Sequence, residues 1–276
     1  MLETIAFMKW PLIACLLLPW LLVYLGLHVL QRQIIFVDLA LAQVAALGPC
    51  AALVAGYDVH EWQSYAFSLG FTLAGAALLS CTRTRNPLVP QEALIGIIYV
   101  VAAAAGILVL NFSPHGKEEL QRSLVGELLV VAPWEIFKTL GIFLVAGVLH
   151  LVFRRQFNAI SRNPDAAEAS GLAVRWWDFF FYLLFGLVVM SFVHIGGVLL
   201  VFTYLIVPAV CAGYLARSLT ARFLVGWGIA TAASIGSLLV TAKADLPIGA
   251  AIVCGLGLTL VVVSLGSTLL RRPARQ

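Results

Sequence analysis

Nine long apolar segments recur along this chain, and their length restricts its fold more than any other feature. A helix needs roughly 20 mostly apolar residues to cross the hydrocarbon core of a membrane. We expect spans at Pro11–Leu30, Ile34–Gly56, Gln63–Thr82, Ala93–Phe112, Glu135–Phe153, Trp176–Val193, Ile195–Ala216, Phe223–Thr241 and Leu246–Leu270. Only a few residues around His194 are left for the turn between the sixth and seventh segments, so eight spans are the alternative.

The composition excludes a soluble domain. Hydrophobic residues make up 62% of the 276 residues and charged residues only 11%, against about 25% charged residues in a soluble protein. A water-exposed globule cannot bury so much apolar surface in one core. The sequence therefore predicts an all-α, polytopic membrane helix bundle that forms a single transmembrane domain over residues 1–276.

Sequence motifs for covalent chemistry are absent. The chain contains no G-x-x-x-x-G-K-[ST], H-E-x-x-H or G-x-S-x-G motif, so it predicts neither an ATPase nor a hydrolase. The net charge of +4 is spread as arginines at the ends of the spans, which does not favour nucleic-acid binding.

The basic residues indicate an orientation. With the N-terminus outside, twelve of the 17 Lys and Arg residues fall on the cytoplasmic side: Arg32, Arg83, Arg85, Arg154, Arg155, Arg162, Arg175, Arg217, Arg222, Arg271, Arg272 and Arg275. Cytoplasmic loops carry such an excess of positive charge. We therefore expect the N-terminus outside and the C-terminus in the cytoplasm.

The longest polar cytoplasmic stretch, residues 154–175, predicts a helix of about two turns. Asn163 is a favourable N-cap, and Pro164 suits the first helical position because its missing N–H needs no partner there. Gly171 supplies the left-handed residue that ends the helix. Two interpretations remain open for this stretch: an ordinary capped loop helix, or a rigid knob that docks into a partner.

Three further residues refine the interpretation of this helix. Asp165 and Glu168 complement the positive end of the helix dipole. Ala167 and Gly171 lie four residues apart, and both are small enough to let a partner approach closely.

Four stretches combine apolar residues with Ala, Gly or Pro. They are Leu41-Ala-Gln-Val-Ala-Ala-Leu-Gly48, Glu92-Ala-Leu-Ile-Gly-Ile-Ile-Tyr99, Asn163-Pro-Asp-Ala-Ala-Glu-Ala-Ser-Gly171, and Gly197-Val-Leu-Leu-Val with Leu205-Ile-Val-Pro-Ala209; Asp245-Leu-Pro-Ile-Gly249 opens the last span. In this order the stretches resemble the metal-ion uptake family of ABC transporter permeases, which import zinc, manganese and iron. The third stretch is similar to the coupling-helix pattern of that family.

The resemblance implies an assembly in the bacterial inner membrane. It implies a permease homodimer, cytoplasmic ABC ATPase subunits docked on the coupling helix, and a periplasmic metal-binding protein that delivers the substrate. ATP would then bind the partner ATPase, while this chain would bind no cofactor and would pass the metal ion as cargo.

The second span departs from the family pattern. Many family members carry Asp-x-x-x-His there, and this chain has Leu39 and Gln43 at those positions. Gln43 is a candidate to line the pathway, or else to hydrogen-bond a neighbouring span. Asp38, one position earlier, is also a candidate because ionisable groups inside a membrane are costly and commonly functional.

Three more residues are pathway candidates. Glu92 opens the fourth span, either as a gate or coupling residue or as a favourable acid in a first helical turn. His194 lies at an outer turn, as a ligand or an interfacial residue. Pro208 removes a backbone hydrogen bond and is expected to kink the seventh span.

Asp178 receives a structural interpretation. It is expected to pair with Arg175, three residues earlier.

The outer loop Ser113–Trp134 and residues 58–61 carry mixed charges. They suit a solvated surface on which a binding protein docks, or else a metal-binding loop. The residues concerned are His115, Lys117, Glu118, Glu119, Glu127, Asp58, His60 and Glu61.

The sequence leaves two rivals to an importer of bare divalent metal ions. The same machine could carry a metal chelate, which the missing Asp/His pair favours. A self-contained secondary transporter would need charged residues at mid-membrane, of which the chain has few.

Overall fold

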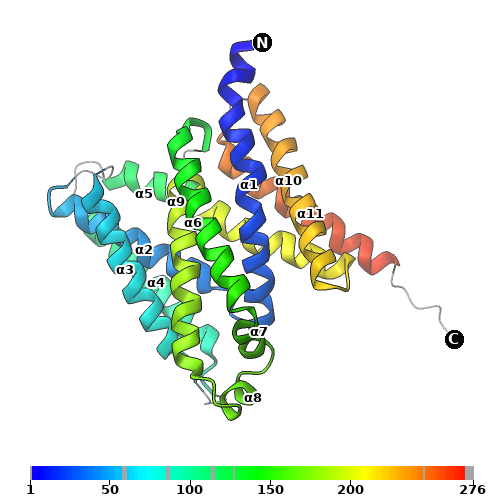
Figure 1. The fold of residues 1–276 in the computed structure, drawn as a ribbon. Coiled ribbons are helices and arrows are strands. Elements are labelled where there is room, and N and C mark those ends of the chain that lie inside the picture. Colours follow the sequence, from blue (N-terminus) through cyan, green and yellow to red (C-terminus); the bar gives the residue numbers. More distant parts are fainter. Residues whose placement is uncertain are drawn as a thin grey trace.

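The computed structural model describes residues 2–57, 61–84, 88–112, 116–126, 128–244 and 246–270. Every regular element in this part of the chain is a helix, as Figure 1 shows. The elements are α1 (Leu2–Arg32), α2 (Val37–Val54), α3 (Trp62–Cys81), α4 (Gln91–Leu110), α5 (Gly116–Val125), the short 3-10 helix η1 (Leu128–Val130), α6 (Pro133–Val152), α7 (Arg154–Arg162), α8 (Pro164–Ala169), α9 (Val174–Leu215), α10 (Leu219–Ala244) and α11 (Ile248–Leu270).

Eight of these helices are long and apolar enough to cross a membrane. Their outer faces carry large exposed apolar side chains, among them Val101 on α4, Leu144 on α6 and Val262 on α11, each more than 60% exposed. Extensive exposed apolar surface on long apolar helices is typical of a face that lipid covers. The predicted all-α, multi-pass membrane bundle is confirmed.

The predicted turn at His194 is not where the chain turns. The sixth and seventh apolar segments lie in one 42-residue helix, α9, whose only non-helical residue is Gly197, with φ 73° and ψ 164°. Glycine takes this conformation readily because it has no Cβ. Gly197 divides α9 into a first arm, residues 174–196, and a second arm, residues 198–215, and Figure 1 shows the chain changing direction sharply between them. The nine predicted segments therefore correspond to eight helices, one of them bent.

Helix α9 forms the centre of the molecule. It packs against α1, α2, α3, α5, α6, α10 and α11. Several of its large side chains are fully buried: Phe181, Tyr182, Phe185, Phe192 and Tyr204. The core of the bundle is therefore built around a single helix.

Two connections contain helices that the sequence interpretation missed. The stretch 154–175 forms α7 as well as α8, and the stretch 113–134 contains α5 and η1. Glu61 and Glu118 are exposed. Asp58, His60, His115, Glu127 and Asp245 lie outside the described residues, as do the side chains of Lys117 and Glu119.

The two ends of the bundle differ. Figure 1 shows the N-terminus at the end opposite to α8. The end of α1, the end of α3 and the start of α9 lie close to α7 and α8. Helix α5 lies near the opposite end, against the bend of α9. We call these the α8 end and the α5 end.

Candidate coupling and transport sites

Helix α8 has the capped geometry that the sequence predicts. The Asn163 side-chain oxygen accepts a hydrogen bond of 3.0 Å from the N–H of Ala166, and Pro164 is the first helical residue. Gly171 has a φ of +89°, and the N–H of Leu172 donates to the carbonyl of Ala167 at 3.1 Å. Both ends of this short helix are thus fixed.

One face of α8 is anchored and the other lies at the surface. Ala167 is buried and belongs to a small apolar cluster with Ile160 of α7 and Val174 at the start of α9. Asp165 and Glu168 are exposed and help to line a groove of about 1100 Å³. Helix α8 is therefore fixed to α7 and to the first turn of α9 by close-packed side chains, which do not deform freely.

A buried ion cluster lies directly behind α8. The Asp178 carboxylate is completely buried and accepts hydrogen bonds from Arg32 Nη1 at 2.9 Å and from Arg83 Nε at 2.5 Å. Arg32 Nε also donates to the Ser161 hydroxyl of α7 at 2.8 Å, and its guanidinium lies 3.8 Å from the ring centroid of Phe181. The predicted Asp178–Arg175 pair is wrong, since Asp178 instead joins α9 to the ends of α1 and α3.

Arg83 is the most accessible member of this cluster. Its side chain is 25% exposed, and it contributes to the groove beside α8 and to a second cavity that Arg32 and Ser161 also line. Burial disfavours its charged form, but the hydrogen bond and the charge of Asp178 outweigh that effect and raise the pKa of Arg83. The ion pair therefore holds Arg83 charged.

Two pathway candidates, Asp38 and Glu92, meet at the α8 end. Glu92 Oε1 accepts a hydrogen bond of 3.1 Å from the N–H of Phe36, just before α2 begins. Asp38 is 1% exposed. Neither of its carboxylate oxygens has a hydrogen-bond partner of good geometry among the described residues, although the N–H groups of residues 38 and 39 lie near it. Because Glu92 is bound to the backbone two residues before Asp38, two carboxylates share this region.

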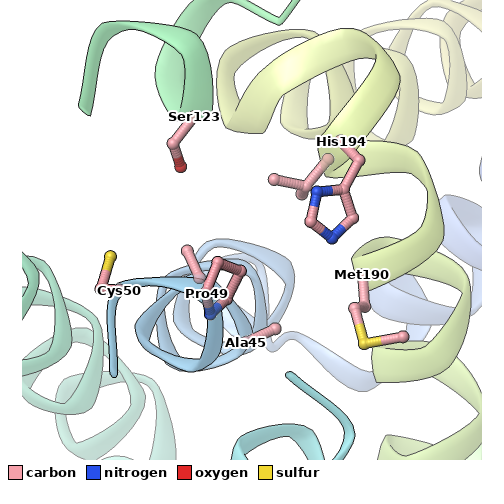
Figure 2. Close-up of a pocket in the computed structure, with 8 residues that line it drawn as sticks. Ala45, Pro49, Cys50, Ser123, Met190 and His194 are labelled. Atoms are coloured by element: carbon pink, nitrogen blue, oxygen red, sulfur yellow. The ribbon is translucent and has the colours of Figure 1, made fainter. Parts of the chain in front are cut away.

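His194 lines a cavity of about 50 Å³ near the α5 end. Figure 2 shows its ring and Met190 on α9 facing Pro49 and Cys50 of α2, with Ser123 of α5 on a further side. Such a volume has room for a few water molecules. The thiol, the thioether and the hydroxyl of this cavity were not identified from the sequence, because no spacing pattern connects residues of α2, α5 and α9.

Gln43 and Pro208 lie outside this cavity. Gln43 is half-buried on α2, between Asp38 and the cavity-lining Ala46. Pro208 is buried in the second arm of α9, where the backbone angles are helical. From Asp38 to Cys50, α2 rises about 18 Å. The structure thus brings Asp38 and Glu92 together but separates them from His194.

The bend of α9 is in backbone contact with α5 and α11. A Cβ on Gly197 would lie 2.5 Å from the backbone nitrogen of Gly126, and a Cβ on Gly249 would lie 2.6 Å from the carbonyl oxygen of Val125. Both Gly126 and Gly197 have positive φ angles. Helix α5, which supplies Ser123 to the cavity, is thus held directly against the bend.

These features define a class: a multi-pass membrane protein with a surface-exposed capped helix at one end of the bundle and a cavity at the other. The chain belongs to the ABC 3 transport family, whose model matches residues 4–267. The family resemblance inferred from the four sequence stretches is confirmed.

The chain is similar to curated membrane transport proteins. It is 30% identical over 205 residues to the "Manganese transport system membrane protein MntC" of Listeria innocua, covering 73% of this chain and 72% of that protein. It is 26% identical over 204 residues to the protein of the same name from Halalkalibacterium halodurans, covering 73% and 70%. The fold resembles a structure described as "PsaBC from Streptococcus pneumoniae in complex with Fab", with a TM-score of 0.78 and 21% identity, covering 95% of this chain and 92% of that one.

Proposed function

We propose that this chain is the membrane-spanning permease subunit of an ATP-driven importer for a divalent transition metal: manganese, zinc or iron. The whole chain forms one transmembrane permease domain in the bacterial plasma membrane and performs no covalent chemistry. The names of the two relatives support a manganese or related metal substrate. Carboxylate oxygens such as those of Asp38 and Glu92 suit manganese better than thiolates do.

The observation that carries the proposal is helix α8. Its six residues are capped at both ends, fixed to α7 and α9 on one face and exposed on the other. A loop needs no such rigidity to connect two spans, whereas a coupling helix does because it must pass on the movement of a partner. ATP binds and is hydrolysed on a separate ABC ATPase subunit that docks on α8.

Two copies of the chain form the permease, with the pathway at their twofold axis. The α8 end is cytoplasmic and the α5 end faces the periplasmic metal-binding protein, so the N-terminus is outside and the C-terminus inside. Each ATPase cycle shifts α8, and the spans alternate between outward-open and inward-open states. The Lys and Arg asymmetry supports this orientation when the two arms of α9 are counted as two crossings of the membrane.

A metal chelate is the second candidate substrate. Leu39 and Gln43 stand at the positions where many family members have Asp and His. A neutral amide is a poor ligand for a bare metal ion but hydrogen-bonds the polar groups of a chelate. The missing ligand pair is the specific observation that favours this candidate.

Uptake into proteoliposomes tests the proposal. The permease is reconstituted with its ATPase and its binding protein, and uptake of manganese, zinc and iron is measured with and without ATP and with and without chelators. We expect uptake that requires ATP and all three components. Uptake of a free metal ion by the permease alone would instead identify a secondary transporter, and uptake only of the chelated metal would favour the second candidate.

A further inference from the structure

We propose that the Arg83–Asp178 ion pair is the link by which the movement of α8, once it has reached the first turn of α9, passes on to α3, with both residues acting as positioning residues. The inference depends on the proposed function, since it requires an ATPase docked on α8. It goes beyond that function because it assigns the transmission of movement to one named pair outside the coupling helix.

The position of Asp178 is the first argument. It lies one helical turn after Val174, the α9 residue that packs with Ala167 of α8. One carboxylate oxygen of Asp178 binds Arg32 at the end of α1 and the other binds Arg83 just after α3. A displacement of the first turn of α9 therefore acts on two further spans through a single side chain.

Arg83 is the more easily broken of the two contacts. Arg32 is 4% exposed, is bound by Ser161 as well as Asp178, and stacks on Phe181. Arg83 is 25% exposed, lies in a connection rather than a helix, and lines the groove that Asp165 and Glu168 also line. A partner seated in that groove would change the surroundings of Arg83 but not those of Arg32.

The chemistry of the Arg83–Asp178 contact also favours a role in passing movement from α9 to α3 over a role in merely holding the two helices together. Replacing a buried ion pair by apolar side chains of similar volume is often neutral or stabilising. Cohesion between α3 and α9 is already provided by their direct packing. What the ion pair adds is a directional bond that is either made or broken, and a two-state element of this kind is what coupling between distant sites requires.

The test is the ratio of metal ions transported to ATP hydrolysed in the complete reconstituted complex. We compare the native chain with Arg83→Gln, which removes the charge, and Arg83→Lys, which keeps it. Arg155→Gln is the matched control, because Arg155 is exposed on α7 at the same end of the bundle and outside the ion cluster. Assembly with the ATPase and the thermal unfolding midpoint are measured on every variant.

We expect Arg83→Gln to assemble normally and to hydrolyse ATP, with a fall of about tenfold in ions transported per ATP. Arg83→Lys should recover part of that loss and Arg155→Gln should match the native ratio. An unchanged ratio in Arg83→Gln overturns the inference, and so does a variant that fails to assemble or unfolds early, since its role would then be structural. If the native complex shows no ATP-dependent uptake, the proposed function fails instead, which is a distinguishable result.

Discussion

Asp178 is the residue on which most of the α8 end depends. Its carboxylate neutralises Arg32, which has almost no access to water. Asp178→Asn would leave a buried guanidinium without its counter-charge, and removing one partner of a buried pair costs about 3–5 kcal/mol. We expect a free energy of unfolding lower by that amount in detergent denaturation. Asp165→Asn, at an exposed position, should change it by less than about 0.5 kcal/mol.

For Asp38 we expect that removing the charge does not lower the stability of the protein. No hydrogen bond of good geometry from the described residues stabilises its buried carboxylate, so the neutral Asp38→Asn should be at least as stable as the native chain. If a cation passes this position, uptake should nevertheless fall by about tenfold. Asp38→Glu keeps the charge and should lose less. Native uptake by Asp38→Asn would remove this residue from the pathway.

The bend in α9 depends on glycine. In Gly197→Ala the new Cβ would meet the backbone of Gly126, and the positive φ would also become unfavourable. Together these effects cost about 3 kcal/mol, which thermal unfolding measures. Gly213→Ala is the matched control in the second arm of the same helix, where a Cβ meets nothing within 4 Å; it should be neutral or slightly stabilising. Equal effects of the two substitutions would contradict this account of the bend.

Helix α8 depends on its N-cap. Asn163→Ala removes the acceptor for the Ala166 N–H and should destabilise the helix by about 1 kcal/mol. Because the helix has only six residues, such a loss increases its fraying. We expect weaker binding of the ATPase, measured by titration of detergent-solubilised permease, with the spans unaffected in circular dichroism. Asn163→Asp retains an oxygen acceptor and should bind normally.

The sequence predicts those helices whose length and ends are determined by residues close together in the chain. Apolar runs predict the spans, and Asn163, Pro164 and Gly171 predict α8, because length and capping depend on neighbouring residues. The partners of Asp178 were not predictable, since Arg32 and Arg83 lie 146 and 95 residues away in the chain. The place of the bend was also missed: the sequence places a turn around His194, but the contact of Gly197 with Gly126 exists only in the folded bundle.

At the scale of the whole molecule, the first arm of α9 connects the two ends. Asp178 near α8 and His194 in the cavity are both on this arm, about 24 Å apart along the helix axis. The arm is largely buried and contacts the helices that surround it. We therefore expect a movement at the α8 end to reach the cavity and the junction with α5, because the first arm is helical from residue 174 to residue 196.

The most direct test of the account is photo-cross-linking from α8 in the assembled complex. In one variant a photoreactive amino acid replaces Glu168, which is exposed on α8. In the other it replaces Phe112, which is 80% exposed and follows the end of α4 that lies away from α8. We predict a cross-link from position 168 to the ATPase subunit and none from position 112. A cross-link to the ATPase from position 112, or none from position 168 in a complex that hydrolyses ATP, would contradict the assignment of α8 as the coupling helix.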